Sequence, residues 1–273
     1  PVIDGKVSIK QVKATGQTNV MTKVATVSIG KAPTLLYDFE DNEWLNQWAA
    51  GGNSQSKTMY KTTDPNEVLF GSGAMAIDYD MSNGNYIGGM DPNKLNNRTV
   101  TFYNDKQGFT PVIPADAKYV GMWVFFPEGL DGCWFRITLQ GYKTDGSGNL
   151  ATAATTMSDF VSMPKNPKVD MGIQGSGEWR FYYTEIGWDT RYGKAWEGIQ
   201  GPYGFYSCQV MWSAFADTAL GYDYNQPDGN TPEEIAANKE IARQKVEESF
   251  EKAKIGTILV DNVMALYGAP TKD

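Results

Sequence analysis

The sequence predicts an all-β protein, an antiparallel β-sandwich with one inserted helix. Two segments more than two hundred residues apart, 37–41 and 256–268, alternate large apolar residues with polar ones. Strands do this when one face packs on a core and the other meets solvent or a ligand. Between them, short alternating runs are separated by Gly, Pro, Asn and Asp, a spacing typical of a sandwich. We therefore expect the two segments to be its first and last strands.

The intervening runs predict further strands and one long connection. Residues 144–175 are rich in Ser, Thr, Asn, Pro and Gly, and a connection of this length is either functional or mobile. The clearest strands are expected at 74–80, 98–103, 118–126, 133–140, 178–185 and 206–214.

The helix is expected to begin at Thr231. Thr231-Pro232-Glu233-Glu234 supplies an N-cap, a first-turn proline and a carboxylate three residues after the cap. Apolar residues then recur at helical spacing as far as Ala253, and Gly256 is a suitable end. This amphipathic pattern predicts that one face of the helix packs on the sandwich.

Strand alternation also assigns faces. In the first strand Phe39 is expected to point inward, with Glu40 on the opposite face. In the last strand Asp261 is expected to share a face with Leu259 and Val263. A carboxylate among apolar neighbours needs a partner, because an unpaired charge is costly to bury.

The N-terminal region predicts a separate small unit. Two alternating stretches, 6–12 and 20–29, are separated by a Thr-Gly-Gln turn and indicate a β-hairpin. We interpret residues 1–32 as the hairpin remnant of a preceding immunoglobulin-like domain, and residues 33–273 as the main domain.

Composition excludes several classes of function. The 273 residues include no histidine, which rules out a Ser-His-Asp triad, a Cys-His pair and a His-ligated zinc site. The formal net charge of -8 disfavours nucleic acid as a partner. No apolar run approaches the ~20 residues of a membrane span, so membrane insertion is not expected.

The two cysteines, Cys133 and Cys208, both fall in expected strands. We favour two buried thiols that pack as small apolar groups. The alternative is a disulfide between neighbouring strands, which would fit an oxidising compartment.

Three motifs carry a resemblance to a known family. The Tyr37-Asp38-Phe39-Glu40-Asp41 strand, the strand 71–80 and the closing strand 260–268 resemble the jelly-roll carbohydrate-binding modules of secreted bacterial polysaccharide-active proteins. More narrowly, they resemble the module that follows an immunoglobulin-like segment at the C-terminus of bacterial phosphodiester glycosidases. The resemblance spans roughly residues 35 to 268.

The resemblance implies a non-catalytic module that binds polysaccharide or oligosaccharide. It further implies an extracellular location, in a secreted or cell-surface multidomain protein, and a monomeric state within that larger chain. It also implies a structural calcium between the terminal strands, held by Glu40, Asp261 and backbone carbonyls near Ser72. Such a set suits calcium, which takes six to eight oxygens in irregular geometry. Asp38 and Asp41 are further candidates, and solvated surface acids are the alternative interpretation.

A polar face provides candidate sugar ligands. Sugars present C–H faces ringed by hydroxyls, so proteins bind them with aromatic rings together with amides, carboxylates and guanidinium groups. In the strand 133–140, Phe135, Ile137 and Leu139 form the apolar set, and the residues between them share the other face. Two further strands supply neighbours. The expected ligand-binding residues are Trp134, Arg136, Thr138, Gln140, Arg180, Tyr182 and Gln209.

Two other functions remain open at this stage. A structural or adhesive spacer domain would have the same fold with its polar face filled by its own loops, for which residues 144–175 are long enough. A two-carboxylate glycosidase would use an acidic pair such as Asp78 and Asp80, or Glu128 and Asp131. No feature of the sequence singles out either pair. A Tyr-based polysaccharide lyase would instead use a Tyr base with a neutralising group opposite, for which Arg is available.

Overall fold

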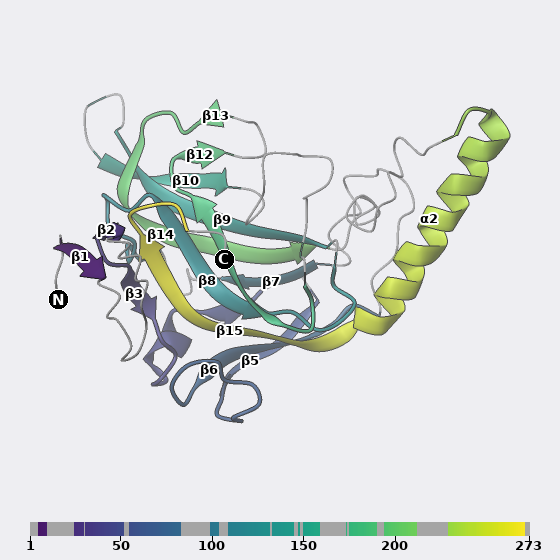
Figure 1. Ribbon diagram of the computed structural model, residues 1–273, viewed down its shortest axis with the longest axis horizontal. Helices are drawn as coiled ribbons and strands as arrows, with labels where there is room; N and C mark the ends of the chain where they lie inside the picture. The colour runs from purple at the N-terminus through teal and green to yellow at the C-terminus, as the bar shows by residue number, and fades with distance from the viewer. Residues whose placement is uncertain are drawn as a thin grey trace, which may run out of the picture.

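The computed structural model describes most of the chain and places its strands in two main sheets (Figure 1). The described residues are 5–9, 25–29, 31–51, 55–82, 99–103, 109–131, 133–144, 147, 150–158, 173, 175–189, 194–211 and 229–270.

Within these residues one main sheet has five strands and the other has six, and the pairings within each sheet are antiparallel. The five-stranded sheet has the order β10 (Leu150–Ser158), β9 (Trp134–Thr144), β14 (Ile199–Met211), β7 (Thr99–Tyr103) and β4 (Ala49–Ala50). The six-stranded sheet has the order β11 (Trp179–Glu185), β8 (Tyr119–Phe125), β15 (Ile255–Leu266), β6 (Ala74–Asp80) and β5 (Ser56–Thr62), with β3 (Thr34–Tyr37) also paired to β15. The β-sandwich predicted from the sequence is confirmed.

The hydrophobic core is formed by alternate side chains of both sheets. Met122 and Val260 contribute from the six-stranded sheet, and Ile137 and Val210 from the five-stranded sheet, each without measurable exposure to solvent. Burying one such side chain stabilises the fold by about 1.5–3 kcal/mol. Because these positions point inward, the residues between them on each strand point away from the core.

The first and last strands of the sandwich pair with each other, which suits the resemblance's placing of a calcium between the terminal strands. Tyr37 of β3 lies opposite Val263 of β15. The first strand lies earlier than the expected 37–41, at Thr34–Tyr37, because Phe39 adopts a left-handed backbone with φ 61° that takes the chain out of the sheet. Phe39 still points inward and is buried, but the segment that follows it is a turn that leads to the short 3-10 helix η1 (Glu43–Asn46).

A β-bulge in β15 corrects the predicted faces of the last strand. Asn262 has φ 40°, and the register with β8 shifts between Asp261 and Val263. The extra residue moves Val263 onto the core face, where it is fully buried, while Asp261 lies opposite Trp123 on the outer face. The prediction that Asp261 and Val263 share a face is therefore wrong.

The inserted helix, α2 (Pro232–Ala253), has the N-cap predicted for it. Thr231 Oγ1 accepts a hydrogen bond from Glu234 N at 3.2 Å. The helix ends at Ala253 rather than at Gly256, and Tyr79 Oη donates to Ala253 O at 2.8 Å. Figure 1 shows α2 extending outward from the start of β15, and Ile241 at its middle is 45% exposed. The helix is attached by its C-terminal end, which corrects the expectation that it packs along the sandwich.

The remaining described strands form two small pairs. The predicted N-terminal hairpin is present as β1 (Gly5–Ile9) and β2 (Ala25–Ile29), which pair with each other. Its origin in a preceding immunoglobulin-like domain stays a prediction. β12 (Trp188–Asp189) pairs with β13 (Lys194–Ala195). Among the helices in the described ranges, none has the length and apolar character to cross a bilayer.

Cys133 and Cys208 are both buried, free thiols. Burial raises the pKa of each thiol well above its usual value, because a thiolate loses its hydration there. The preference for thiols over a disulfide is confirmed.

Candidate functional site

The outer face of the five-stranded sheet carries a polar row that crosses three neighbouring strands. Arg136 of β9 lies directly opposite Gln209 of β14, which in turn lies opposite Thr101 of β7. These three residues form what we call the polar row. They face away from the core because the residues that flank them on each strand are apolar and buried.

Hydrogen bonds connect the polar row from strand to strand. Arg136 Nη1 donates to Gln209 Oε1 at 3.4 Å, and Gln209 Nε2 donates to Thr101 Oγ1 at 3.5 Å. Both bonds are longer than the usual 2.7–3.2 Å, so they hold the side chains only weakly. A guanidinium, an amide and a hydroxyl together offer both donors and acceptors, as a hydroxyl-rich ligand requires.

Two other predicted residues of β9 lie beside the polar row and are buried, as is Thr101 of the row itself, which is 3% exposed. Thr138 lies opposite Ser207, and both are 3% exposed. Gln140 lies opposite Gly204, where a Cβ atom would come within 2.4 Å of Thr110 O. The chain itself therefore covers this end of the face. Among the described residues, no hydrogen-bond partner is found for Gln140 Oε1, although that atom is buried.

Trp134 begins β9 opposite Met211, one row beyond Arg136. Its side chain lies outside the described part of the chain.

Two predicted ligand residues belong to the other sheet. Tyr182 of β11 is 3% exposed and packs edge-on against Phe126 and Phe135, with ring centroids 5.2 and 5.7 Å away. Tyr182 is a core residue, so the expectation that it forms part of a ligand face is wrong. Arg180 is exposed and its Nη2 donates to Glu178 Oε2 at 2.9 Å. Neither residue joins the polar row.

The structure brings the three predicted metal-site residues to one turn, residues 69–73, which we call the carboxylate turn. Glu40 Oε1 accepts a hydrogen bond from Ser72 N at 2.9 Å, and its Oε2 accepts one from Ser72 Oγ at 2.6 Å. A Cβ atom on Gly71, which has φ 65°, would lie 1.8 Å from Glu40 Oε1. Only glycine allows both this backbone conformation and this approach.

Asp261 holds the same turn from the other side. Its Oδ2 accepts hydrogen bonds from Leu69 N at 3.1 Å and Phe70 N at 2.8 Å, and its Oδ1 accepts one from Asn262 N at 2.7 Å. Asp261 has no exposed surface. The sequence-based expectation that this carboxylate needs partners is confirmed, and the partners are backbone amides.

The two carboxyl groups differ in their electrostatics. Burial, with a smaller contribution from the negative charge of Glu40, raises the pKa of Asp261 to about 6, although its hydrogen bonds act in the opposite direction. The hydrogen bonds from Ser72 lower the pKa of Glu40. A cation at this turn would relieve the repulsion between the two groups and favour the ionised form of Asp261.

The donor atoms at the carboxylate turn fit calcium in type, since both side chains offer hard oxygens. Ser72 appears here as a hydrogen-bond donor to Glu40. Among the described residues, no group of three or more acidic, His or Cys side chains is placed to hold a metal. The two carboxylates fall short of the six to eight oxygens that calcium takes, so backbone carbonyl oxygens would have to supply the rest of a calcium shell.

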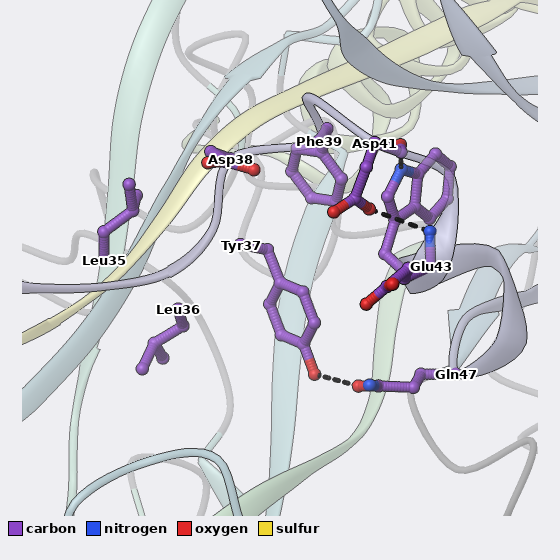
Figure 2. A pocket seen from close by; sticks show the side chains of 9 residues that line it. Leu35, Leu36, Tyr37, Asp38, Phe39, Asp41, Glu43 and Gln47 are labelled. Carbon is purple, nitrogen blue, oxygen red and sulfur yellow. Dashed lines mark hydrogen bonds between the residues drawn. The ribbon is translucent and has the colours of Figure 1, made fainter.

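A pocket of about 240 Å³ lies between β3 and η1 (Figure 2). Tyr37 Oη donates to Gln47 Oε1 at 2.6 Å, and Asp41 Oδ1 accepts from Glu43 N at 2.8 Å. Asp38 and Asp41, the further calcium candidates, line this pocket. The sequence does not predict it, because it forms only when the chain turns at Phe39. Its lining residues are Leu35, Leu36, Tyr37, Asp38, Phe39, Asp41, Glu43, Trp44 and Gln47.

Comparisons with known proteins find likeness only among solved structures. No protein-family model matches the chain, and no curated protein matches it. One similar structure comes from work on the promiscuous specificity of carbohydrate-binding modules of the β-sandwich superfamily, at 14% identity over 95% of this chain and 73% of the other, with TM-score 0.43. Another is the xylan-binding domain of carbohydrate-binding module family 22, at 14% identity over 87% of this chain and 97% of the other, with TM-score 0.36. A third is a family 22 xylan-binding domain from Paenibacillus barcinonensis, at 12% identity over 89% of this chain and 100% of the other, with TM-score 0.38. Likeness at this level assigns neither a family nor a ligand to this chain.

Proposed function

We propose that this chain is a non-catalytic carbohydrate-binding module that holds a secreted or cell-surface multidomain protein near polysaccharide. The observation that carries the proposal is the polar row of Arg136, Gln209 and Thr101 on the outer face of the five-stranded sheet. Three strands of a rigid sheet position these groups, and rigid positioning reduces the entropy lost on binding.

The chemistry of the polar row favours a neutral, hydroxylated ligand. A sugar hydroxyl can accept a hydrogen bond from Arg136 and donate one to Gln209 Oε1. Thr101 is buried and accepts a hydrogen bond from Gln209 Nε2, so it orients Gln209 rather than the sugar. The weak bonds within the row are exchanged at little cost. A polyanion is disfavoured because the chain carries a net charge of -8.

Affinity measurements on a panel of neutral polysaccharides test this proposal. We expect Arg136→Ala and Gln209→Ala each to weaken binding about tenfold or more, which corresponds to about 1.4 kcal/mol. Arg180→Ala is the matched control, since Arg180 is exposed on the other sheet. Wild-type affinity in both row variants, with an unchanged unfolding temperature, would remove the proposed site.

The main alternative is a spacer domain without its own ligand. The covering of the sheet by Thr110 at Gly204 is the observation that favours it. A spacer predicts that the folded chain binds no member of the panel. Product release during the same experiment would instead indicate a glycosidase or a lyase and would overturn the non-catalytic assignment.

We also propose that the carboxylate turn binds calcium through Glu40 and Asp261. Calcium should raise the unfolding temperature relative to chelator, and binding should release protons near pH 6 because Asp261 has a raised pKa. Glu40→Gln and Asp261→Asn should abolish the shift, whereas Asp80→Asn should not, because Asp80 is hydrogen-bonded to Ser82 elsewhere. Identical unfolding curves with calcium and with chelator would contradict this assignment.

A further inference from the structure

The outer face of the six-stranded sheet carries a layer of aromatic side chains. Tyr119, Trp123 and Phe125 come from β8, and Trp179, Phe181 and Tyr183 come from β11; we call these six side chains the aromatic face. Each is partly exposed. The core is filled by the alternate residues of the same strands, such as Val124 and Tyr182, so the aromatic face is additional to the core.

The rings form a continuous layer across the two strands. Neighbouring ring centroids lie 5.7 Å apart for Trp123 and Phe181, and 6.0 Å apart for Phe125 and Trp179. A Cβ atom on Gly121 would lie 2.6 Å from Cζ of Phe181. The Phe181 ring therefore lies down across β8 in the space that a side chain at Gly121 would occupy. The ring is thus held close against the backbone of β8.

Further residues extend this layer toward solvent and toward the neighbouring strands. Phe70 packs against Trp123 at 5.8 Å and is 40% exposed. On β5, Tyr60 is 38% exposed and lies in the same cross-strand row as Phe125, with Ala76 and Leu259 between them.

A polar group borders the aromatic layer. Asp78 Oδ2 accepts a hydrogen bond from Thr58 Oγ1 at 2.7 Å, and its Oδ1 accepts bonds from Thr257 Oγ1 at 2.7 Å and Tyr60 Oη at 3.4 Å. These residues occupy the row next to that of Tyr60 and Phe125. Aromatic rings therefore adjoin a fixed set of hydroxyls and a carboxylate.

We propose that the aromatic face, with its Tyr60–Asp78 border, is a second binding surface for a neutral polysaccharide. Pyranose rings present C–H faces that stack on aromatic rings and hydroxyls that bond to polar neighbours, and both kinds of partner occur here side by side. The six rings of the aromatic face carry no charge, which suits an uncharged polymer. The surface lies on the sheet opposite to the polar row. The proposal of this surface rests on the proposed function only in taking a neutral polysaccharide as the class of ligand.

Two surfaces on opposite sides of one sandwich have a functional consequence. A single module could contact two polysaccharide chains, or one chain and a polymer surface, at the same time. Simultaneous contact would raise the apparent affinity for insoluble polymer above that for a short oligosaccharide.

Binding isotherms on insoluble and soluble forms of the same neutral polysaccharides test the proposal. Phe70→Ala and Tyr60→Ala alter exposed side chains and should leave the fold intact, while Trp179→Ala removes a ring of the layer itself. We expect each to weaken binding to insoluble polymer about tenfold. The double variant Arg136→Ala/Gln209→Ala should keep residual binding to the insoluble polymer through the aromatic face. Adding Trp179→Ala to this double variant should remove that residual binding. Ile241→Ala is the control, an exposed apolar residue at the middle of α2 and away from the aromatic face.

The outcomes separate this proposal from the proposed function. Wild-type binding by all three folded aromatic variants would overturn the second surface and leave the polar row standing. Loss of binding only in the aromatic variants would support the second surface and remove the polar row as the site. A wild-type chain that binds no polysaccharide would overturn both. Unchanged glycan binding together with self-association that the aromatic variants abolish would identify a protein-docking surface instead.

Discussion

Asp261 is a buried carboxylate that serves the backbone of a segment distant in sequence. Its two oxygens accept hydrogen bonds from Leu69 N, Phe70 N and Asn262 N. The side chain therefore satisfies amides both at the bulge of β15 and at the turn that precedes β6. A buried donor without a partner costs about 1–3 kcal/mol. Asp261 therefore contributes to the free energy of unfolding more by accepting hydrogen bonds from these amides than by its charge.

We expect Asp261→Ala to lower the free energy of unfolding by about 2–4 kcal/mol, because two amides of the carboxylate turn lose their acceptor. Urea unfolding in chelator measures the change. Glu185→Ala, at the exposed end of β11, is the control and should fall within about 0.5 kcal/mol of wild type. An equally small effect of both substitutions would show that water replaces the carboxylate.

The raised pKa of Asp261 predicts an unusual pH dependence. The folded state binds this proton more tightly than the unfolded chain, in which the pKa is near 3.8, so the contribution of Asp261 to stability falls as the pH rises from about 4 to about 6. The loss is about 1.4 kcal/mol for each unit of pKa difference. Unfolding free energies measured in chelator from pH 4 to 7 should show this loss in wild type relative to Asp261→Asn.

Glu40 acts with the opposite sign and at lower pH. Its lowered pKa contributes stability that is present above its usual value of 4.5 and is lost as the pH falls through the folded value. The comparison with Asp261→Asn isolates the buried group, because Glu40 is common to both proteins. Parallel curves for the two proteins would contradict the raised pKa of Asp261.

At the scale of elements, β8 shows how one strand can support two different layers. Its core face carries Val120, Met122 and Val124, all fully buried. Its outer face carries aromatic residues and Gly121, over which the ring of Phe181 lies. Because Gly121 has no side chain, the Phe181 ring of the aromatic face can lie close against the backbone of β8.

Gly121→Val tests this packing. A side chain here would meet Phe181 Cζ and Tyr182 O within 2.6 Å, so the ring must move and the β8–β11 pairing is strained. We expect a loss of about 1–3 kcal/mol in unfolding free energy. Gly187→Ala is the control for replacing a glycine, since a Cβ there meets no atom within 4 Å, although its φ of 93° itself disfavours alanine. A loss at Gly121 no larger than at Gly187 would show that the ring yields freely.

At the scale of the whole molecule, β15 lies at the centre of the six-stranded sheet. It pairs with β8 on one side and with β6 and β3 on the other. The last strand of the chain therefore joins segments that are far apart in sequence. By contrast, β1 and β2 pair only with each other among the described strands.

Truncation distinguishes these two roles. Removal of residues 1–30 should leave cooperative unfolding, with a midpoint within a few degrees of that of the full chain, because Lys31, its ion pair with Asp116 and the whole sandwich remain. Removal of residues from Ile255 onward should abolish cooperative unfolding, because β8 and β6 lose their shared neighbour. Thermal unfolding followed by near-UV circular dichroism measures both. A sandwich that fails to fold without residues 1–30 would contradict the predicted domain boundary.

The sequence by itself determined what depends on neighbouring residues along the chain. Alternation located many of the strands, although it missed β5 and also β10, which lies within the expected connection 144–175. Thr231 marked the start of α2, and the positions of Arg136 and Gln209 between core residues placed both on an outer face. The apolar neighbours of Asp261 showed that it needs partners. Each of these follows from local periodicity or local hydrogen bonding.

Only the tertiary structure decided which face of an ambiguous strand is buried and where the register shifts. β11 is aromatic on both faces, so local pattern could not show that Tyr182 packs in the core and Phe181 on the outer face; the position of the opposing sheet decides it. The bulge at Asn262 falls where β15 leaves its pairing with β6, which ends at Val260, and begins its pairing with β3 at Val263. The aromatic face, the pocket beyond Phe39 and the outward course of α2 depend on contacts between distant segments, which period-two alternation does not encode.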